Sequence, residues 1–191
     1  MSKVVVVTGV PGSGKSTVVD GALKKLEKEG VVYLLMNYGD AMLELMKERH
    51  GVTDRDEMRK VPTESYRGIQ REAGRRIAEQ AKKNPVLVDT HCLVKKPEGY
   101  YPGLPLWVLE ELKPELIIIV EASAEEIGGR RSKDAKRMRD KEMLHDVDEH
   151  QQLNRAAAMA YAAISGATVR VIQNRDKGLN DAVMEMVSAL R

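Results

Sequence analysis

The chain has 191 residues, of which 42% are hydrophobic and 31% charged, a balance typical of a globular domain with a sizeable core. Its net charge of +2 is too small to indicate a nucleic-acid or membrane partner, and no segment approaches the roughly 18 apolar residues that a bilayer span needs. The single cysteine, Cys92, excludes an intramolecular disulfide and favours a reducing compartment. We therefore expect a cytoplasmic protein in which residues 1–191 form one domain.

Five short runs rich in β-branched residues alternate with longer helical patterns. The runs are nearly continuous in apolar residues, which is typical of parallel strands covered on both faces. This alternation predicts an α/β domain with a parallel sheet and right-handed crossovers. The predicted strands are Val4–Thr8, Val31–Met36, Val86–Thr90, Leu116–Glu121 and Thr168–Ile172. Because the first run follows Met1 so closely, we interpret it as a core strand and not as a signal peptide.

Helices are predicted between these strands from apolar periodicity and from helix-breaking residues. The first has an apolar stripe from Val19 to Leu26 and ends at Gly30. Further helices are predicted at Asp40–His50, at Thr63–Lys83, in an alanine-rich stretch that ends at Gly166, and at Asn180–Leu190. Two charged stretches, Asp54–Pro62 and Gly128–Lys141, interrupt the alternation, and we expect them to be moving parts.

The segment after the first strand matches G-x-x-x-x-G-K-[ST] without a mismatch, between a predicted strand and a predicted helix. Its glycines let backbone N–H groups approach phosphate oxygens, and the positive end of the following helix adds to the attraction. Lys15 is predicted to reach the β- and γ-phosphates, and the Ser16 hydroxyl to be a ligand of Mg²⁺. The predicted ATP-binding loop comprises Gly9, Val10, Pro11, Gly12, Ser13, Gly14, Lys15, Ser16 and Thr17.

The same motif occurs in GTP-binding switch proteins, whose other motifs do not match this chain. Asp89-Thr90-His91-Cys92 lacks the glycine of Asp-x-x-Gly, and Asn174-Arg175-Asp176-Lys177 does not fit Asn-Lys-x-Asp. Asp89 ends the third strand, at the sheet edge where open α/β proteins bind ligands, so we expect it to hold Mg²⁺ directly or through water. His91 is predicted to hydrogen-bond within the loop, to touch a phosphate or to be a packed structural histidine.

Several segments, in order along nearly the whole chain, resemble the archaeal-type adenylate kinases. They are Gly9–Thr17, Asn37–Asp40, Asp54–Lys60, Asp89–His91 and Gly99–Pro105. The most selective part is Asp-Thr-His together with Gly-Tyr-x-Pro-Gly-Leu-Pro. The resemblance implies a P-loop NTPase three-layer fold with a central five-stranded parallel sheet, a small acceptor-binding helical region and an arginine-rich lid. It also implies conversion of ATP and AMP into two ADP, by a homotrimer.

The acceptor-binding segment is predicted at about 38–62. The loop from Asn37 to Asp40 follows a strand end, and guanidinium groups grip phosphates in a bidentate manner. The predicted AMP-binding residues are Asn37, Gly39, Asp40, Arg55, Arg59, Asp89 and His91. In the next helix, Arg67, Arg71 and Arg75 lie on one face among glutamates, which favours a surface salt-bridge network.

The lid is predicted at about 128–142, where positive charge is concentrated. A basic segment that closes over two nucleotides would stabilise the charge of the transferred phosphoryl group and exclude water. Arg130 and Arg131 are predicted to bind ATP at its adenine, while Arg137 and Arg139 are predicted as catalytic residues beside Lys15 and Arg59. We expect the pair Gly128-Gly129 to loosen the hinge. The loop Gln173–Gly178 should lie beside the donor base.

Three functions are open, with phosphoryl transfer from ATP to AMP first. The second is another P-loop kinase with CMP, UMP or a non-nucleotide alcohol as acceptor. The third is a nucleotide-dependent RNA-binding or ribosome-assembly factor, whose affinity would fall steeply with salt. We expect ATP and AMP as partners, Mg²⁺ as cofactor, and neither a membrane nor a nucleic acid.

Overall fold

The computed structural model describes residues 3–52, 54, 57–60, 62–96, 99–133 and 144–191. Its centre is a five-stranded sheet with the order β2-β3-β1-β6-β7, in which every neighbouring pair is parallel. The strands are Val4–Thr8 (β1), Leu34–Asn37 (β2), Val86–Asp89 (β3), Leu116–Glu121 (β6) and Thr168–Gln173 (β7). The predicted central sheet is therefore confirmed.

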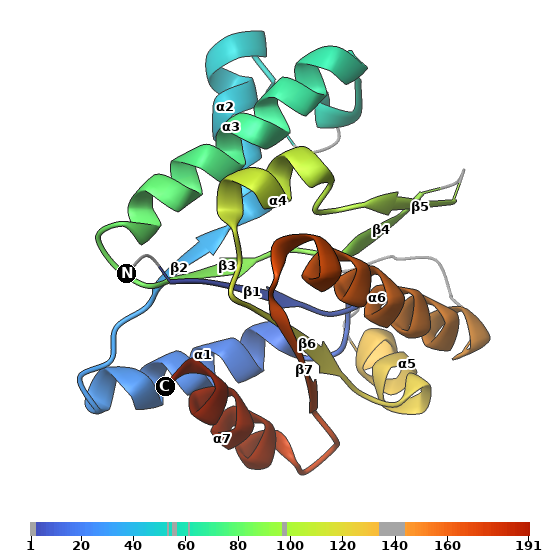
Figure 1. Cartoon of the computed structure of the whole chain (residues 1–191). Helices are drawn as coiled ribbons and strands as arrows, with labels where there is room; N and C mark the ends of the chain where they lie inside the picture. The colour runs from blue at the N-terminus through green and yellow to red at the C-terminus, as the bar shows by residue number, and fades with distance from the viewer. Residues whose placement is uncertain (1–2, 53, 55–56, 61, 97–98, 134–143) are drawn as a thin grey trace.

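Helices cover both faces of the sheet (Figure 1). One face carries α1 (Lys15–Lys28) and α7 (Leu179–Leu190), and the other carries α2 (Tyr38–His50), α3 (Thr63–Ala81), α4 (Leu106–Leu112) and α6 (Leu144–Ser165). Successive strand residues point to opposite faces, so Val4 and Val6 join one core while Val5 and Val7 join the other. Each fully buried valine contributes roughly 1.5–3 kcal/mol relative to an exposed one.

The prediction that every strand is covered on both faces is wrong for the two edge strands. The central strands β1, β3 and β6 are almost entirely buried, whereas Leu35 in β2 is 41% exposed and Val171 in β7 is 37% exposed. An edge strand has a neighbour on one side only, so its apolar side chains are less well covered. The second strand also begins at Leu34 and not at Val31, because the Val31 N–H completes the end of α1 by bonding to the Leu26 carbonyl at 2.9 Å.

Within the described residues, four short elements near the site, two strands and two helices, were not predicted. Strands β4 (Leu93–Lys96) and β5 (Gly99–Pro102) form a separate antiparallel pair, and α4 follows them. Figure 1 shows this hairpin projecting beyond the carboxyl edge of the main sheet. A short 3₁₀ helix, η1 (Glu57–Lys60), lies within the predicted acceptor-binding segment.

α5 (Ala124–Lys133) continues through Gly128 and Gly129, so the expected loosening of a hinge by these glycines stays a prediction. A Cβ atom on Gly128 would lie 3.2 Å from the Leu144 side chain, so this glycine allows α5 to approach the start of α6 closely. Of the predicted lid, residues 134–142 lie outside the described residues. Among the helices that are described, none has both the length and the apolar character required to cross a bilayer.

Candidate active site

The phosphate-binding loop joins β1 to α1 at the carboxyl edge of the sheet. Gly12 and Gly14 have φ angles of +90° and +83°, a region that residues with side chains rarely adopt. A Cβ atom on Gly14 would also lie 2.2 Å from the Nδ2 atom of Asn174. Gly14 is the N-cap of α1, so the free N–H groups of the first turn, at Lys15 and beyond, face the loop. The loop is thus built as an anion cradle, as the motif predicts.

Lys15 and Asp89 form an ion pair at this cradle. The parallel register of β1 and β3 places Asp89 beside Val7, the second residue before the loop. The Lys15 ammonium also lies 3.3 Å from the Thr90 carbonyl oxygen. Ser16, in the first turn of α1, and Asp89 are oxygen donors of the kind that Mg²⁺ takes in nucleotide sites. The residues present therefore fit a Mg²⁺ ion, with the carboxylate balanced by Lys15 in this structure.

His91 connects the cradle to the loop after β3. Its Nδ1 atom lies 3.3 Å from the Gly9 carbonyl oxygen, which can only accept, so Nδ1 carries the proton. The protein atoms packed around the ring, and next the Lys15 ammonium, lower the pKa of His91 to about 4. The imidazole is therefore neutral at pH 7, although one side of the residue is exposed. His91 therefore bonds to the phosphate-binding loop and also borders a cavity, while its predicted contact with a phosphate stays a prediction.

That cavity, of about 150 Å³, lies next to the cradle and is walled by α2, η1, α3, the end of β3 and the β4–β5 hairpin. We call it the acceptor cavity. Its volume is below the roughly 300–1,000 Å³ of pockets that enclose whole small molecules, so it would hold a part the size of a base. The wall residues that bear on the argument are Asn37, Tyr38, Gly39, Met42, Met58, Tyr66, Gln70, Asp89, His91 and Tyr101.

Four of the predicted AMP-binding residues, Asn37, Gly39, Asp89 and His91, line this cavity. Asp40 lies outside the wall that the described residues form. Its backbone N–H instead donates to the Asn37 side chain at 3.1 Å, which caps α2. Arg55 and the side chain of Arg59 lie outside the described residues, so their predicted roles stay predictions.

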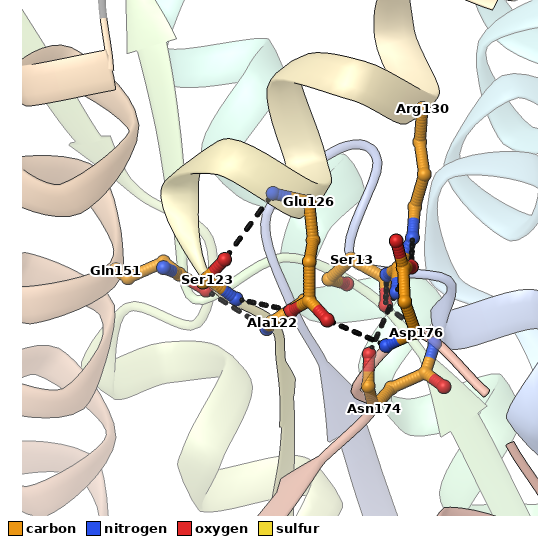
Figure 2. A network of polar contacts seen from close by, with 8 residues as sticks. All are labelled: Ser13, Ala122, Ser123, Glu126, Arg130, Gln151, Asn174 and Asp176. Atoms are coloured by element: carbon orange, nitrogen blue, oxygen red, sulfur yellow. Dashed lines mark hydrogen bonds and ion pairs between the residues drawn. The ribbon is translucent and has the colours of Figure 1, made fainter. Parts of the chain in front are cut away.

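A polar network ties α5 to the cradle (Figure 2). The Arg130 guanidinium donates to the backbone oxygens of Ser13 at 3.2 Å and Asn174 at 2.8 Å, and it pairs with Asp176 at 2.7 Å. The Asn174 side-chain amide donates to the same Ser13 oxygen at 2.8 Å. Glu126 accepts from the Asp176 backbone N–H at 2.5 Å. The predicted lid residue Arg130 thus lies against the ATP-binding loop. The side chain of Arg131 and both Arg137 and Arg139 lie outside the described residues.

Sequence reasoning missed Asn174, Asp176 and Gln70. Asn174 and Asp176 lie in the loop Gln173–Gly178, which the sequence placed beside the donor base without singling out a side chain. The salt-bridge interpretation of α3 is confirmed, and it extends to other helices: Arg71 pairs with Glu111 of α4 at 2.7 Å, and Arg76 with Glu48 of α2 at 2.9 Å.

A larger cavity, of about 690 Å³, lies between α5, α6 and the ends of β6 and β7. It contains the buried Glu121, which pairs with Arg155 and accepts from Gln173 at 3.1 Å. Gln173 and Arg175, from the loop predicted beside the donor base, line it, but none of the individually predicted phosphate- or AMP-binding residues does. Position and chemistry, and not size, therefore favour the smaller acceptor cavity as the substrate site.

Comparisons with known proteins agree with this geometry. Residues 8–148 match the family described as AAA domain. The shikimate kinase of Bacteroides thetaiotaomicron, 15% identical, superposes with a TM-score of 0.53 over 98% of both chains, which shows the shared P-loop kinase fold. The adenylate kinase of Methanothermobacter thermautotrophicus is 52% identical over 98% of this chain and 99% of its own length. The adenylate kinase of Methanopyrus kandleri is 53% identical over 100% of this chain and 99% of its own length. The adenylate kinase of Methanocaldococcus jannaschii is 50% identical over 100% of this chain and 99% of its own length. Half of the residues are thus shared along the full length of these archaeal enzymes, and the chain belongs to the adenylate kinase family.

Proposed function

We propose that the protein transfers the γ-phosphoryl group of Mg²⁺-bound ATP reversibly to AMP, giving two ADP. One observation carries this proposal: the phosphate cradle and the acceptor cavity meet at Asp89 and His91, which belong to both. Two nucleotides seated in these neighbouring sites would bring a donor phosphate and an acceptor phosphate together. Proximity and orientation of this kind supply much of the catalysis of phosphoryl transfer.

On the donor side, the backbone N–H groups of the loop would bind the polyphosphate, and Lys15 would leave Asp89 to contact the transferred group. Ser16 and Asp89 would hold Mg²⁺, which when bound supplies positive charge to the β- and γ-phosphate oxygens. Arg130 is already positioned at the loop by Asp176. Arg131, Arg137 and Arg139 complete the proposed donor side and lid.

On the acceptor side, the cavity would hold the base while the phosphate extends towards Lys15, with Arg55 and Arg59 as its proposed ligands. A phosphate is already a nucleophile at neutral pH, so the reaction needs no general base. The low pKa of His91 is consistent with this, because the neutral ring keeps its proton on the bond to Gly9. Its proposed role is to position the loop. A homotrimer is an expectation that rests on the resemblance, and a cytoplasmic location is an expectation that rests on the single cysteine and the composition of the sequence.

The direct test is a coupled assay of ADP formation from Mg²⁺-ATP with AMP, GMP, CMP, UMP or no acceptor. We expect AMP to be the preferred substrate by a wide margin. Turnover with CMP or UMP and none with AMP would assign the chain to another acceptor. The absence of turnover with all four, in folded protein that binds ATP, would refute the proposed reaction.

A further inference from the structure

Of the amide side chains in the wall of the acceptor cavity, that of Gln70 is almost completely buried. Gln70 is in the middle of α3, is only 2% exposed, and borders the cavity among mainly apolar and aromatic residues. Burying an amide without hydrogen bonds costs roughly 1–3 kcal/mol in proteins. The bonds that this side chain makes therefore indicate what it is placed to do.

Within the described part of the chain, the Gln70 side chain has one hydrogen-bond partner, the Nε1–H group of Trp107 on α4, at 3.3 Å from Oε1. An indole N–H can only donate, so the amide atom that faces it has to be the oxygen. Turning the amide over would put two donors against each other. Trp107 thus fixes the side chain in one of its two orientations, with the Nε2 amine directed away from α4.

The backbone of Gln70 is also held. The hydroxyl of Tyr38, itself buried and at the cavity wall, donates to the Gln70 carbonyl oxygen at 2.8 Å. Arg67 covers the Trp107 ring, with the guanidinium carbon 5.2 Å from the ring centroid. Helices α2, α3 and α4 therefore fix one donor–acceptor pair inside a base-sized cavity. Fixed geometry of this type is what selectivity between similar ligands requires.

The amide oxygen has a second lone pair beside the one that Trp107 uses. Gln70 can therefore present one donor and one acceptor side by side. At its N1 edge adenine presents the complementary pair, N1 as the acceptor next to the 6-amino group as the donor, and glutamine can contact such a pair in a bidentate manner, as it does N7 and the 6-amino group. Guanine in the same pose presents an oxygen at position 6 and so opposes the amide oxygen. A match would require the reversed amide that Trp107 disfavours.

We propose that Gln70 recognises the adenine of the acceptor and that Trp107, by fixing the amide orientation, makes this contact selective against guanine. This inference rests on the proposed function, since it names the base-reading residue of the same acceptor site. Gln70 would contact the base, and Trp107 would act as a positioning residue.

The test compares kcat/KM for AMP and GMP in the wild type, Gln70→Met, Trp107→Phe and the control Arg71→Met. We expect Gln70→Met to lower kcat/KM for AMP about tenfold to hundredfold, mainly through KM, with little change for GMP. Trp107→Phe should raise kcat/KM for GMP and narrow the AMP-to-GMP ratio at least about fivefold. Arg71→Met removes an exposed ion pair between α3 and α4 and leaves the Gln70 amide in place. Its AMP-to-GMP ratio of kcat/KM should therefore equal that of the wild type.

A substrate change avoids dependence on variant folding. Purine riboside 5′-monophosphate lacks the 6-amino group. The kcat/KM of the wild type for this substrate should therefore be at least about tenfold lower than for AMP. Gln70→Met should have equal kcat/KM for the two substrates. Equal AMP-to-GMP and AMP-to-purine ratios in the wild type and Gln70→Met would overturn the inference while leaving AMP phosphorylation intact. If the wild type does not phosphorylate AMP, the proposed function fails instead, and calorimetric binding of AMP and GMP still tests the amide.

Discussion

The donor cradle and the acceptor cavity are adjacent, yet they are built in different ways. The cradle is one contiguous loop, Gly9–Thr17, whose chemistry resides mainly in backbone N–H groups and a single lysine. The acceptor cavity draws on five separate segments between β2 and β5, and its chemistry resides in side chains. A contiguous backbone site is visible in a sequence motif, whereas a side-chain site becomes visible only after the chain has folded.

The two regions also differ in how they are kept in place. The cradle is charged and is held from outside its motif by Asn174 and Arg130. The acceptor cavity is largely apolar and is organised around one amide, Gln70, that neighbouring helices orient. Substitutions should therefore affect the donor at the cradle and its braces, and the acceptor at the cavity wall.

The largest effect should come from Lys15→Ala, which removes the charged side chain of the cradle. We expect kcat to fall at least about hundredfold, because preorganised charge at the transferred group contributes about that much. The fold should persist, since Lys15 lies at the start of α1 outside both main cores. The coupled assay and circular dichroism measure the two outcomes. Retention of more than about 5% activity would contradict the donor assignment.

Asp89→Asn tests the carboxylate that the two sites share. We expect turnover to fall about tenfold to hundredfold and the Mg²⁺ concentration for half-maximal activity to rise, because the amide is a weaker oxygen ligand. The pH profile should keep its shape, since Asp89 does not abstract a proton in this scheme. Mg²⁺ titrations of activity provide the measurement. Unchanged turnover with unchanged Mg²⁺ dependence would exclude the proposed role.

Asn174→Ala should affect the donor side alone. The substitution removes the buried hydrogen bond from Asn174 to the Ser13 carbonyl, which then has one donor fewer. If the loss of about 1–2 kcal/mol falls on the free energy of ATP binding, KM for ATP rises about fivefold to thirtyfold. KM for AMP should stay within about twofold of the wild type. The control is Asn180→Ala, whose side chain accepts an exposed hydrogen bond from Lys25 at 3.3 Å, far from the Ser13 carbonyl. An equal rise in both KM values would show that Asn174 does not act through the cradle.

His91, which borders both regions, should make stability depend on pH. Its pKa in the folded protein is lowered to about 4, whereas an unfolded histidine titrates near 6.5. The unfolded chain thus gains a proton that the folded chain does not, so stability is full above about pH 6.5 and falls towards pH 4. Urea unfolding of the wild type and of His91→Gln at pH 7 and pH 5 measures the free energy of unfolding at each pH. The decrease in this free energy from pH 7 to pH 5 should be smaller in the variant. An identical decrease in the two proteins would refute the assignment of this pH dependence to His91.

The smallest effect should come from Arg76→Met, which breaks an exposed pair with Glu48 on the outer side of the acceptor helices. Exposed pairs of this type contribute little because water and salt screen them. Values of kcat/KM for ATP and AMP should stay within about twofold of the wild type. A larger selective loss with AMP would mean that the salt-bridge face of α3 takes part in acceptor binding.

Particular residues show where sequence reasoning succeeded and where it could not. The strands of the buried centre, the end of α1 at Gly30 and the end of α6 at Gly166 are local signals, and the structure bears them out. The exposed edge of β2 depends on strand order, which one strand's sequence does not contain. The role of Gly128, which leaves room for Leu144 of α6 beside α5, depends on the packing of another helix.

By itself, the sequence determined the phosphate loop and the sheet, because backbone angles, helix ends and apolar runs are encoded by adjacent residues. Only the tertiary structure decided that Asn174 bonds to Ser13 of the loop, 161 positions earlier in the chain, and that Trp107 orients Gln70. Hydrogen bonds of this kind require two side chains or chain segments to meet at about 3 Å. The packing of helices and strands, and not any local pattern, sets that distance.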